Sequence, residues 1–245
     1  INIINNYDGT MIKYANIKYF RKISDVVLQP TIFLFCILCI VSLYYALYAS
    51  PPDYQQGEMV RVMYIHVPFA WLSLGIYCAI AILSVFAVKW KSIISYIYAQ
   101  SLSHIGIVYT CLTLITGMLW GKPIWGAYWV WDARLTSMLI LLIIYLGYIL
   151  ICNATNTHRS IKPASVFAII GLINIPIIKF SVNIWYSLHQ GPSILRTQGV
   201  AIHSSMLTPL LLMFCTMILL TIILFIIRTK TLIITLSTNR HKQLL

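Results

Sequence analysis

The sequence predicts an all-α integral membrane protein with six transmembrane helices and with both termini on the cytoplasmic or matrix side. Three observations support this fold class. Of the 245 residues, 60% are hydrophobic and only 9% are charged, whereas a soluble domain carries charge on about a quarter of its residues. Six long stretches contain no charged residue, and the Lys and Arg residues concentrate in alternate loops.

Each uncharged stretch predicts a helix, because a backbone that faces lipid must satisfy its own hydrogen bonds. Five of the stretches reach the range of about 17 to 25 residues that spans a bilayer. The fifth is shorter and is interrupted by Pro176, which predicts a kink. The stretches are residues 26–52, with their apolar part at 31–49, and then 62–88, 92–121, 135–152, 163–178 and 200–227.

The Lys and Arg residues predict the orientation. Twelve of the seventeen lie in the two tails and in the second and fourth loops, and loops on the cytoplasmic side carry such an excess of cations. The other five fall on the opposite, outer side: Arg61, Lys122, Arg134, Lys179 and Arg196. The formal charge of +12 is therefore a topology signal and implies no nucleic-acid partner.

The chain is expected to form one membrane domain of six helices, residues 31–227, with an outer-side tryptophan-rich loop at 120–134. Basic tails at 1–30 and 228–245 are expected on the inner side. No internal repeat is visible. The first residues show no apolar core of a cleavable signal peptide, and Met11 is a candidate initiator.

The tryptophan-rich stretch, WGKPIWGAYWVWDAR, predicts a binding platform. It contains four of the seven tryptophans: Trp120, Trp125, Trp129 and Trp131. An indole ring is a flat apolar surface with one N–H donor and suits the boundary between membrane and water. Four indoles within about a dozen residues exceed what an interfacial anchor needs, and they indicate a flat apolar ligand.

Three of the six histidines are predicted on the same outer side: His66, His189 and His203. The others, His104, His158 and His241, are predicted toward the inner side. A single histidine near a helix end is usually structural. Two imidazoles from separate segments beside stacked indoles, however, are what a haem iron requires as axial ligands. Arg61 and Arg134 are the outer-side cations nearest in sequence, so they are candidates to pair with haem propionates.

Asp132 has two compatible interpretations. It pairs with Arg134 or caps the fourth helix, where a carboxylate near the N-terminus is favourable. Alternatively, it orients an indole N–H or a ligand histidine.

The six cysteines are predicted to pack inside or at the end of apolar spans: Cys36, Cys39, Cys78, Cys111, Cys152 and Cys215. Cys36 and Cys39 have C-x-x-C spacing, but a reactive thiol needs an exposed, electropositive setting. No predicted outer segment contains a cysteine. Neither disulfides nor covalent attachment of haem is therefore indicated.

Three segments carry a family resemblance: YQQGEMVRVMYIHVP at 54–68, WGKPIWGAYWVWDARLTS at 120–137 and WYSLHQG at 185–191. Through them the sequence resembles the cytochrome c maturation protein C family, also called haem exporter protein C, over nearly its whole length. The family's motif is denser in tryptophan, and Tyr128 occupies one of those positions here. The aromatic face is retained.

This resemblance implies a multi-pass protein of a bacterial or mitochondrial inner membrane that binds haem b non-covalently at the outer surface. It implies His66 and His189 as axial ligands of the haem iron, with the tryptophan loop covering the haem. It also implies delivery of haem to a membrane-anchored haem chaperone during c-type cytochrome biogenesis, together with ATP-driven transporter subunits. The family assembles cytochromes, so the protein is expected not to be an enzyme.

Three other functions compete with this interpretation. A haem lyase shares the tryptophan motif, but such relatives are longer and have more spans. A membrane thiol–disulfide carrier needs an accessible cysteine pair, which the placement of Cys36 and Cys39 opposes. A solute transporter needs charged or broken helices at the middle of the membrane, and the spans here are free of charge.

Overall fold

Six helical segments are long and apolar enough to cross a membrane, as the sequence predicted: Ile17–Ala49, Glu58–Lys89, Ile93–Trp125, Ala133–Ala154, Arg159–Ile184 and Ser204–Thr238. The computed structural model describes residues 17–154, 157–185, 187–189, 191, 199 and 201–244. Met11 and the first part of the expected N-terminal tail lie outside these residues. Within them, the β pairing consists of one isolated bridge, between Asp53 and Gly57.

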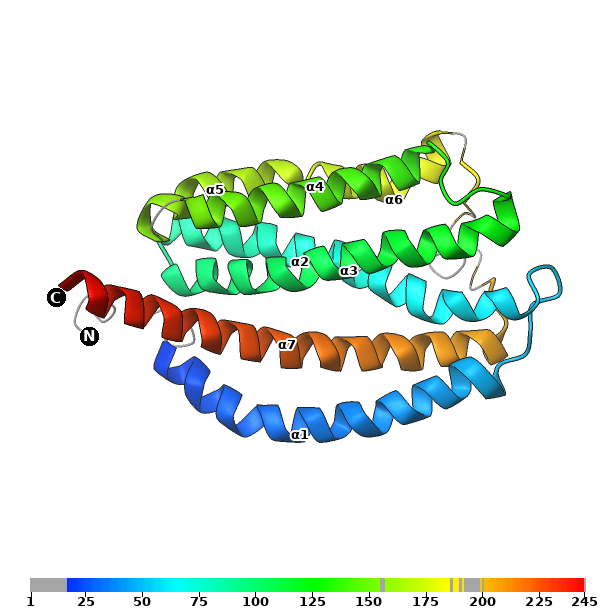
Figure 1. Ribbon diagram of the computed structural model, residues 1–245, viewed down its shortest axis with the longest axis horizontal. Coiled ribbons are helices and arrows are strands. Elements are labelled where there is room, and N and C mark those ends of the chain that lie inside the picture. Colours follow the sequence, from blue (N-terminus) through cyan, green and yellow to red (C-terminus); the bar gives the residue numbers. More distant parts are fainter. Residues whose placement is uncertain are drawn as a thin grey trace.

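The helices follow one another along the chain (Figure 1). They are α1 (Ile17–Tyr44), which continues into the π-helical turn η2 (Tyr45–Ala49), then the 3₁₀ turn η3 (Glu58–Val62), α2 (Met63–Lys89), α3 (Ile93–Trp125), α4 (Ala133–Ala154), α5 (Thr157–Gly171), α6 (Asn174–Ile184) and α7 (Ser204–Leu244).

The bundle has three layers of roughly parallel helix axes (Figure 1). Helices α2 and α3 form the middle layer and pack extensively on each other. Helices α4 and α5 cover one side of this layer, with α6 packed against α4, and α7 covers the other side, with α1 packed against α7. The first helix is therefore the outermost element.

Tyrosines fill the core between α2, α4 and α5, and their hydroxyls reach backbone carbonyls. Tyr145 donates to the carbonyl of Ser73 at 2.7 Å, and Tyr77 donates to that of Ala168 at 3.0 Å. The two rings meet edge to face with centroids 5.2 Å apart. A buried hydroxyl without a partner is costly in an apolar medium, so these bonds fix how α2 sits against α4 and α5.

The expected basic tails are partly helical extensions of the spans. Residues 17–30 belong to α1, and residues 228–244 continue α7. A small apolar cluster stabilises this region, with Phe20 of α1, Ile94 and Ile97 of α3, and Ile233 of α7. Lys230 also pairs with Asp25 across the two helices. Tertiary packing thus prolongs helices that hydropathy alone would end at the membrane boundary.

The fifth span is broken, and the break precedes Pro176. Helix α5 ends at Gly171 and α6 begins at Asn174. Pro176 therefore lies in the first turn of α6, where its missing N–H would be unpaired in any case. The buried Asn174 side chain donates to the carbonyl of Ser137 on α4 at 2.9 Å, so the break is held by the neighbouring helix.

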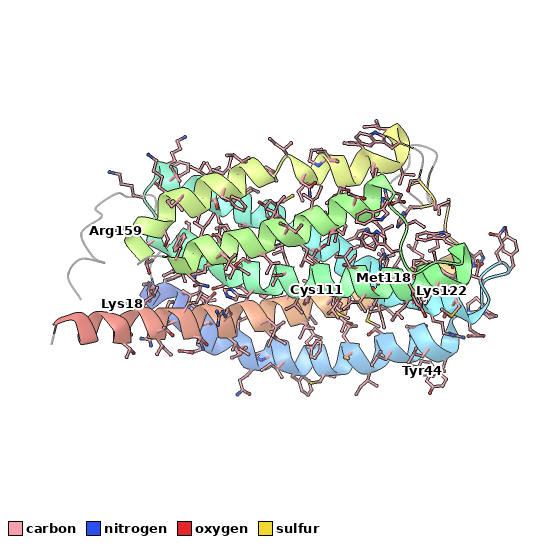
Figure 2. The ribbon with its side chains drawn as sticks, turned by 45° about the horizontal axis from the view of Figure 1, so that its top comes forward. Lys18, Tyr44, Cys111, Met118, Lys122 and Arg159 are labelled. Atoms are coloured by element: carbon pink, nitrogen blue, oxygen red, sulfur yellow. The ribbon has the colours of Figure 1, made fainter. Side chains whose placement is uncertain are left out.

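The two ends of the bundle differ in charge and aromatic content. Lys18 and Arg159 lie at one end, here called the basic end, and Lys122 lies at the other, here called the tryptophan end (Figure 2). The α2–α3 connection, with Lys89 and Lys91, also lies at the basic end. The cation-rich and cation-poor loops, which alternate along the chain, thus lie at opposite ends of the bundle.

Candidate functional site

The tryptophan stretch is a helix end followed by a short loop, which corrects the expected loop at 120–134. Trp120 and Trp125 belong to the last turns of α3, and Ala133 begins α4, so the loop runs from 126 to 132. Gly126 ends α3 because it adopts a left-handed conformation (φ 77°) and donates its N–H to the carbonyl of Lys122. The helical part holds its two indoles in fixed positions relative to α2.

His66, on the second turn of α2, lies against the last turns of α3. Its Nδ1 is 3.0 Å from the hydroxyl of Thr116, and its ring meets Trp120 edge to face with centroids 5.7 Å apart. Gly117 makes room for the ring, since a Cβ at that position would lie 3.0 Å from Cε1 of His66. One face of α3, formed by residues 116, 117 and 120, therefore seats this imidazole.

The first connecting loop supports Trp120. Its indole N–H donates to the side-chain carbonyl of Gln56 at 3.0 Å. Gln56 is placed by a tight turn in which the carboxylate of Asp53 accepts the N–H groups of Gln55 and Gln56, at 2.9 and 2.8 Å. Asp53 thus contributes to the site indirectly, by shaping this loop.

His189 is held by the loop that precedes α4. Its Nδ1 lies 2.8 Å from Oδ2 of Asp132, and its ring meets Trp125 edge to face with centroids 4.8 Å apart. The hydroxyl of Ser187 donates to the same carboxylate oxygen at 2.6 Å and accepts the backbone N–H of His189 at 3.2 Å. The carboxylate therefore fixes both the imidazole and the short segment that carries it.

Asp132 also caps α4, as one interpretation of the sequence predicted, while its contact with His189 is the geometry that the other interpretation requires. Its Oδ1 accepts the N–H of Leu135 at 2.7 Å, and its backbone carbonyl accepts that of Thr136. The expected ion pair between Asp132 and Arg134 is not formed within the described residues. Each oxygen of this 8%-exposed carboxylate is already committed elsewhere.

The electrostatics keep Asp132 ionised and His189 neutral. Burial alone would raise the pKa of Asp132, but hydrogen bonds from Ser187, from the Leu135 N–H and from His189 hold it below its ordinary value. Burial lowers the pKa of His189, and this effect outweighs the favourable Asp132 carboxylate, with Arg134 lowering it further. A neutral imidazole is the form that binds a metal.

The other two indoles of the stretch lie in the loop. The rings of Trp129 and Trp131 meet edge to face with centroids 5.4 Å apart. Trp131 is 78% exposed, whereas the Nε1 of Trp129 is buried and has no hydrogen-bond partner among the described residues. The site thus contains one unused donor and one indole open to the surroundings.

The two candidate arginines have different environments. Arg61 donates from Nη1 to the carbonyl of Ala46 and to both the carbonyl and the hydroxyl of Ser50, and from Nε to Glu58. It therefore joins η3 to the end of α1. Arg134, on the first turn of α4, makes no side-chain hydrogen bond within the described part of the chain. Its positive charge interacts electrostatically with both His66 and His189.

The family model described as heme exporter protein C matches residues 10–244. The chain belongs to this family. Relatives include a ccmC-like mitochondrial protein of cytochrome c biosynthesis from Marchantia polymorpha, 47% identical over 85% of this chain and 90% of its own length. The heme exporter protein C of Bradyrhizobium diazoefficiens is 42% identical (83% and 78%), and that of Escherichia coli K12 is 39% identical (78% and 77%).

The remaining histidines of this heme exporter protein C family member have structural roles where the structure describes them. His203 accepts the N–H of Ser205 through Nδ1 and so caps α7, which is the kind of hydrogen-bonding role expected for it. His104 lies within hydrogen-bond distance of the Gln100 carbonyl through Nδ1 and of Arg228 through Nε2. The side chains of His158 and His241 lie outside the described part.

The cysteines of this family member all lie in helices and are free. Cys111 lies at mid-length of the bundle in Figure 2. The C-x-x-C pair of α1 is partly accessible on the surface of the helix, but it lies within the span Ile17–Ala49 and not in a loop at the tryptophan end. The predicted placement of the cysteines in the spans is confirmed.

The donor set fits a haem better than a bare metal ion. Zinc and similar ions take three or four protein ligands, and the described residues contain no group of three His, Cys, Asp or Glu side chains that could hold an ion. Two imidazoles suffice for a haem, which brings its own equatorial nitrogens. Four indoles and one uncommitted arginine suit its flat ring and its propionates.

Sequence reasoning missed Thr116, Gly117, Gln56 and Ser187. Thr116 and Gly117 precede Trp120 by four and three residues, so helical periodicity would have placed them on one face once α3 was known to continue to Trp125. Ser187 stands two residues before His189, which is a common spacing for a serine that bonds the local backbone. Gln56 has no signal in the sequence.

Proposed function

We propose that the protein binds haem b non-covalently at the outer face of a bacterial or mitochondrial inner membrane and delivers it to a haem chaperone during c-type cytochrome biogenesis. One observation carries this proposal. At the tryptophan end, His66 and His189 come from separate segments, each bonded through Nδ1 and each set edge-on against an indole. Both imidazoles thus have their Nε2 atoms available as axial ligands.

Haem would supply an iron that binds imidazole and a flat apolar ring. His66 and His189 would hold the iron through their Nε2 atoms, and the indoles of Trp120, Trp125, Trp129 and Trp131 would cover the ring. Arg134 is the better partner for a propionate because its guanidinium makes no hydrogen bond within the described residues. In Arg61, Nε and Nη1 are already hydrogen-bonded and only Nη2 remains for such a contact. Asp132 acts on the site through His189.

The distribution of cations supports the outer location. Lys18 and Arg159 mark the end opposite to the site (Figure 2), and an excess of Lys and Arg faces the cytoplasm or matrix. The tryptophan end then faces the periplasm or the intermembrane space, with both termini inside. Trp131, exposed in the loop, gives the haem chaperone an apolar contact next to the site. The ATP-driven transporter subunits and membrane lipid are the other partners.

The protein acts as a carrier in this proposal and not as an enzyme. A haem lyase is the closest rival, but the chain covers 77% to 90% of the length of heme exporter protein C relatives. The thiol–disulfide carrier needs an exposed thiol at the tryptophan end, and none of the described cysteines lies in a loop.

The visible absorption spectrum of the protein purified in detergent from haem-replete cells tests the proposal. A low-spin b-type spectrum is expected, and acid–acetone should extract the colour completely. A colourless protein, or haem that stays with the polypeptide after extraction, would contradict it.

A further inference from the structure

The two imidazoles at the tryptophan end are held by chemically different partners. Thr116 donates its own hydroxyl proton to the carbonyl of Leu112 at 2.6 Å. At its 3.0 Å contact with His66 the hydroxyl therefore acts as acceptor, and Nδ1 of His66 carries the proton. Nδ1 of His189 likewise donates, but to the carboxylate of Asp132 at 2.8 Å.

This difference makes the two Nε2 atoms unequal as metal ligands. A carboxylate accepts a stronger hydrogen bond than a neutral hydroxyl, and it increases the basicity of the imidazole that donates to it. Asp132 is itself fixed by its bonds to Leu135 and Ser187. The imidazole of His66 is held by neutral groups alone: the Thr116 hydroxyl, the backbone of Thr113 and an indole edge.

We propose that Thr116 and Asp132 are positioning residues that make His189 the retained iron ligand and His66 the exchangeable one. The inference rests on the proposed function. In delivery, His66 would be the imidazole that gives way to a group of the acceptor, and His189 would be the one that holds the haem. Unequal ligands would let one bond be exchanged while the other prevents loss of the haem.

Space for an incoming group lies close to the His66 side. A cavity of about 280 Å³ is lined by Gln55, Gln56, Met59, Pro123 and Ile124. Gln56 links this cavity to the site through its bond with the indole N–H of Trp120, whose ring contacts His66. A rearrangement of Gln56 would therefore give an incoming group access to His66, the weaker ligand.

The test compares Thr116→Val, Thr116→Ser and Asp132→Asn with the parent, each purified in detergent with haem. The first measurement is the rate at which saturating carbon monoxide replaces a histidine on reduced haem. Thr116→Val should raise this rate about fivefold, the change expected for the loss of one hydrogen bond. Thr116→Ser keeps the hydroxyl and should match the parent, and Asp132→Asn should change the rate less than Thr116→Val does.

The second measurement is the midpoint potential, which a general loosening of the fold would not change in one variant and leave unchanged in the other. Asp132→Asn should raise it, since a weaker donor favours the reduced iron, whereas Thr116→Val should leave it close to the parent value. Thr116→Ala replaces Thr116→Val if the latter accumulates poorly.

Two results would overturn the inference alone: equal rates for the parent and Thr116→Val, or faster exchange in Asp132→Asn than in Thr116→Val. In both cases a low-spin spectrum of the parent leaves the proposed function standing. A parent without that spectrum overturns the proposed function and the inference together.

Discussion

Asp132 and His189 are 57 residues apart in the chain, and Oδ2 of the carboxylate lies 2.8 Å from Nδ1 of the imidazole. The other oxygen of the same carboxylate caps α4 through the N–H of Leu135. One side chain thus ties a candidate metal ligand to the start of a membrane helix. Movement of the loop between α3 and α4 is therefore coupled to the position of His189.

Removing either candidate ligand should alter the spectrum without emptying the site. His66→Ala and His189→Ala should each lose the low-spin bis-imidazole spectrum, and added imidazole should restore part of it, because the indoles and Arg134 still hold the ring. The double variant should lose haem. His203→Ala is the control and should match the parent, since His203 only caps α7. A normal spectrum in either single variant would refute the ligand assignment.

Gly117 should be intolerant of even one methyl group. In Gly117→Ala the new Cβ would lie 3.0 Å from Cε1 of His66, so the imidazole must shift and its ligation should weaken. Gly75→Ala, on α2, is the matched control because nothing lies within 4 Å of its Cβ. Absorption spectra of both variants check this. The prediction fails if the two spectra are the same.

Arg61 should contribute to the stability of the fold, whereas Arg134 should contribute to the retention of haem. Arg61→Ala removes hydrogen bonds from a charged donor to the end of α1, so it should lower the free energy of unfolding by about 1.5–3 kcal/mol. Arg134→Ala should leave thermal unfolding in detergent nearly unchanged and should reduce haem retention. Loss of haem with normal stability in Arg61→Ala would instead assign the propionate contact to Arg61.

Haem binding by the haem-free protein should weaken in acid. His189 must be neutral to bind iron, and burial already lowers its pKa below 6.5. Affinity should therefore stay constant from about pH 8 to about 6.5 and fall as the pH drops through the lowered pKa. Asp132, whose own pKa is lowered, remains ionised in this window and favours the imidazolium.

In Asp132→Asn that stabilising charge is absent, so the pKa of His189 falls further. The acid limb of the binding curve should move to lower pH, as measured by haem titration at a series of pH values. A limb displaced to higher pH would contradict the electrostatic role assigned to Asp132.

The cysteines should be dispensable. All six lie in helices of the bundle and are free, and none contributes to the site. Replacement of all six with Ala or Ser should preserve haem content and support of cytochrome c maturation. If maturation is lost while protein levels stay normal, the thiol-carrier hypothesis regains support.

The sequence by itself determined the number of spans, the separation of cations and the candidate ligands. These are local properties: a run of apolar residues must form a helix in lipid wherever it stands in the fold. His66, His189 and the four tryptophans are also evident from their residue types and from the family motifs that contain them.

Only the tertiary structure decided how these residues pair. Thr116 accepts from His66 across 50 residues, and Asp132 accepts from His189 across 57. Arg61 joins η3 to η2 and to Ser50, whereas Arg134 makes no side-chain hydrogen bond within the described residues. The continuation of α3 to Trp125, which brings Trp120 to His66 and Trp125 to His189, was likewise not predicted. Such contacts depend on the distances and angles between packed helices, and hydropathy carries no information about these.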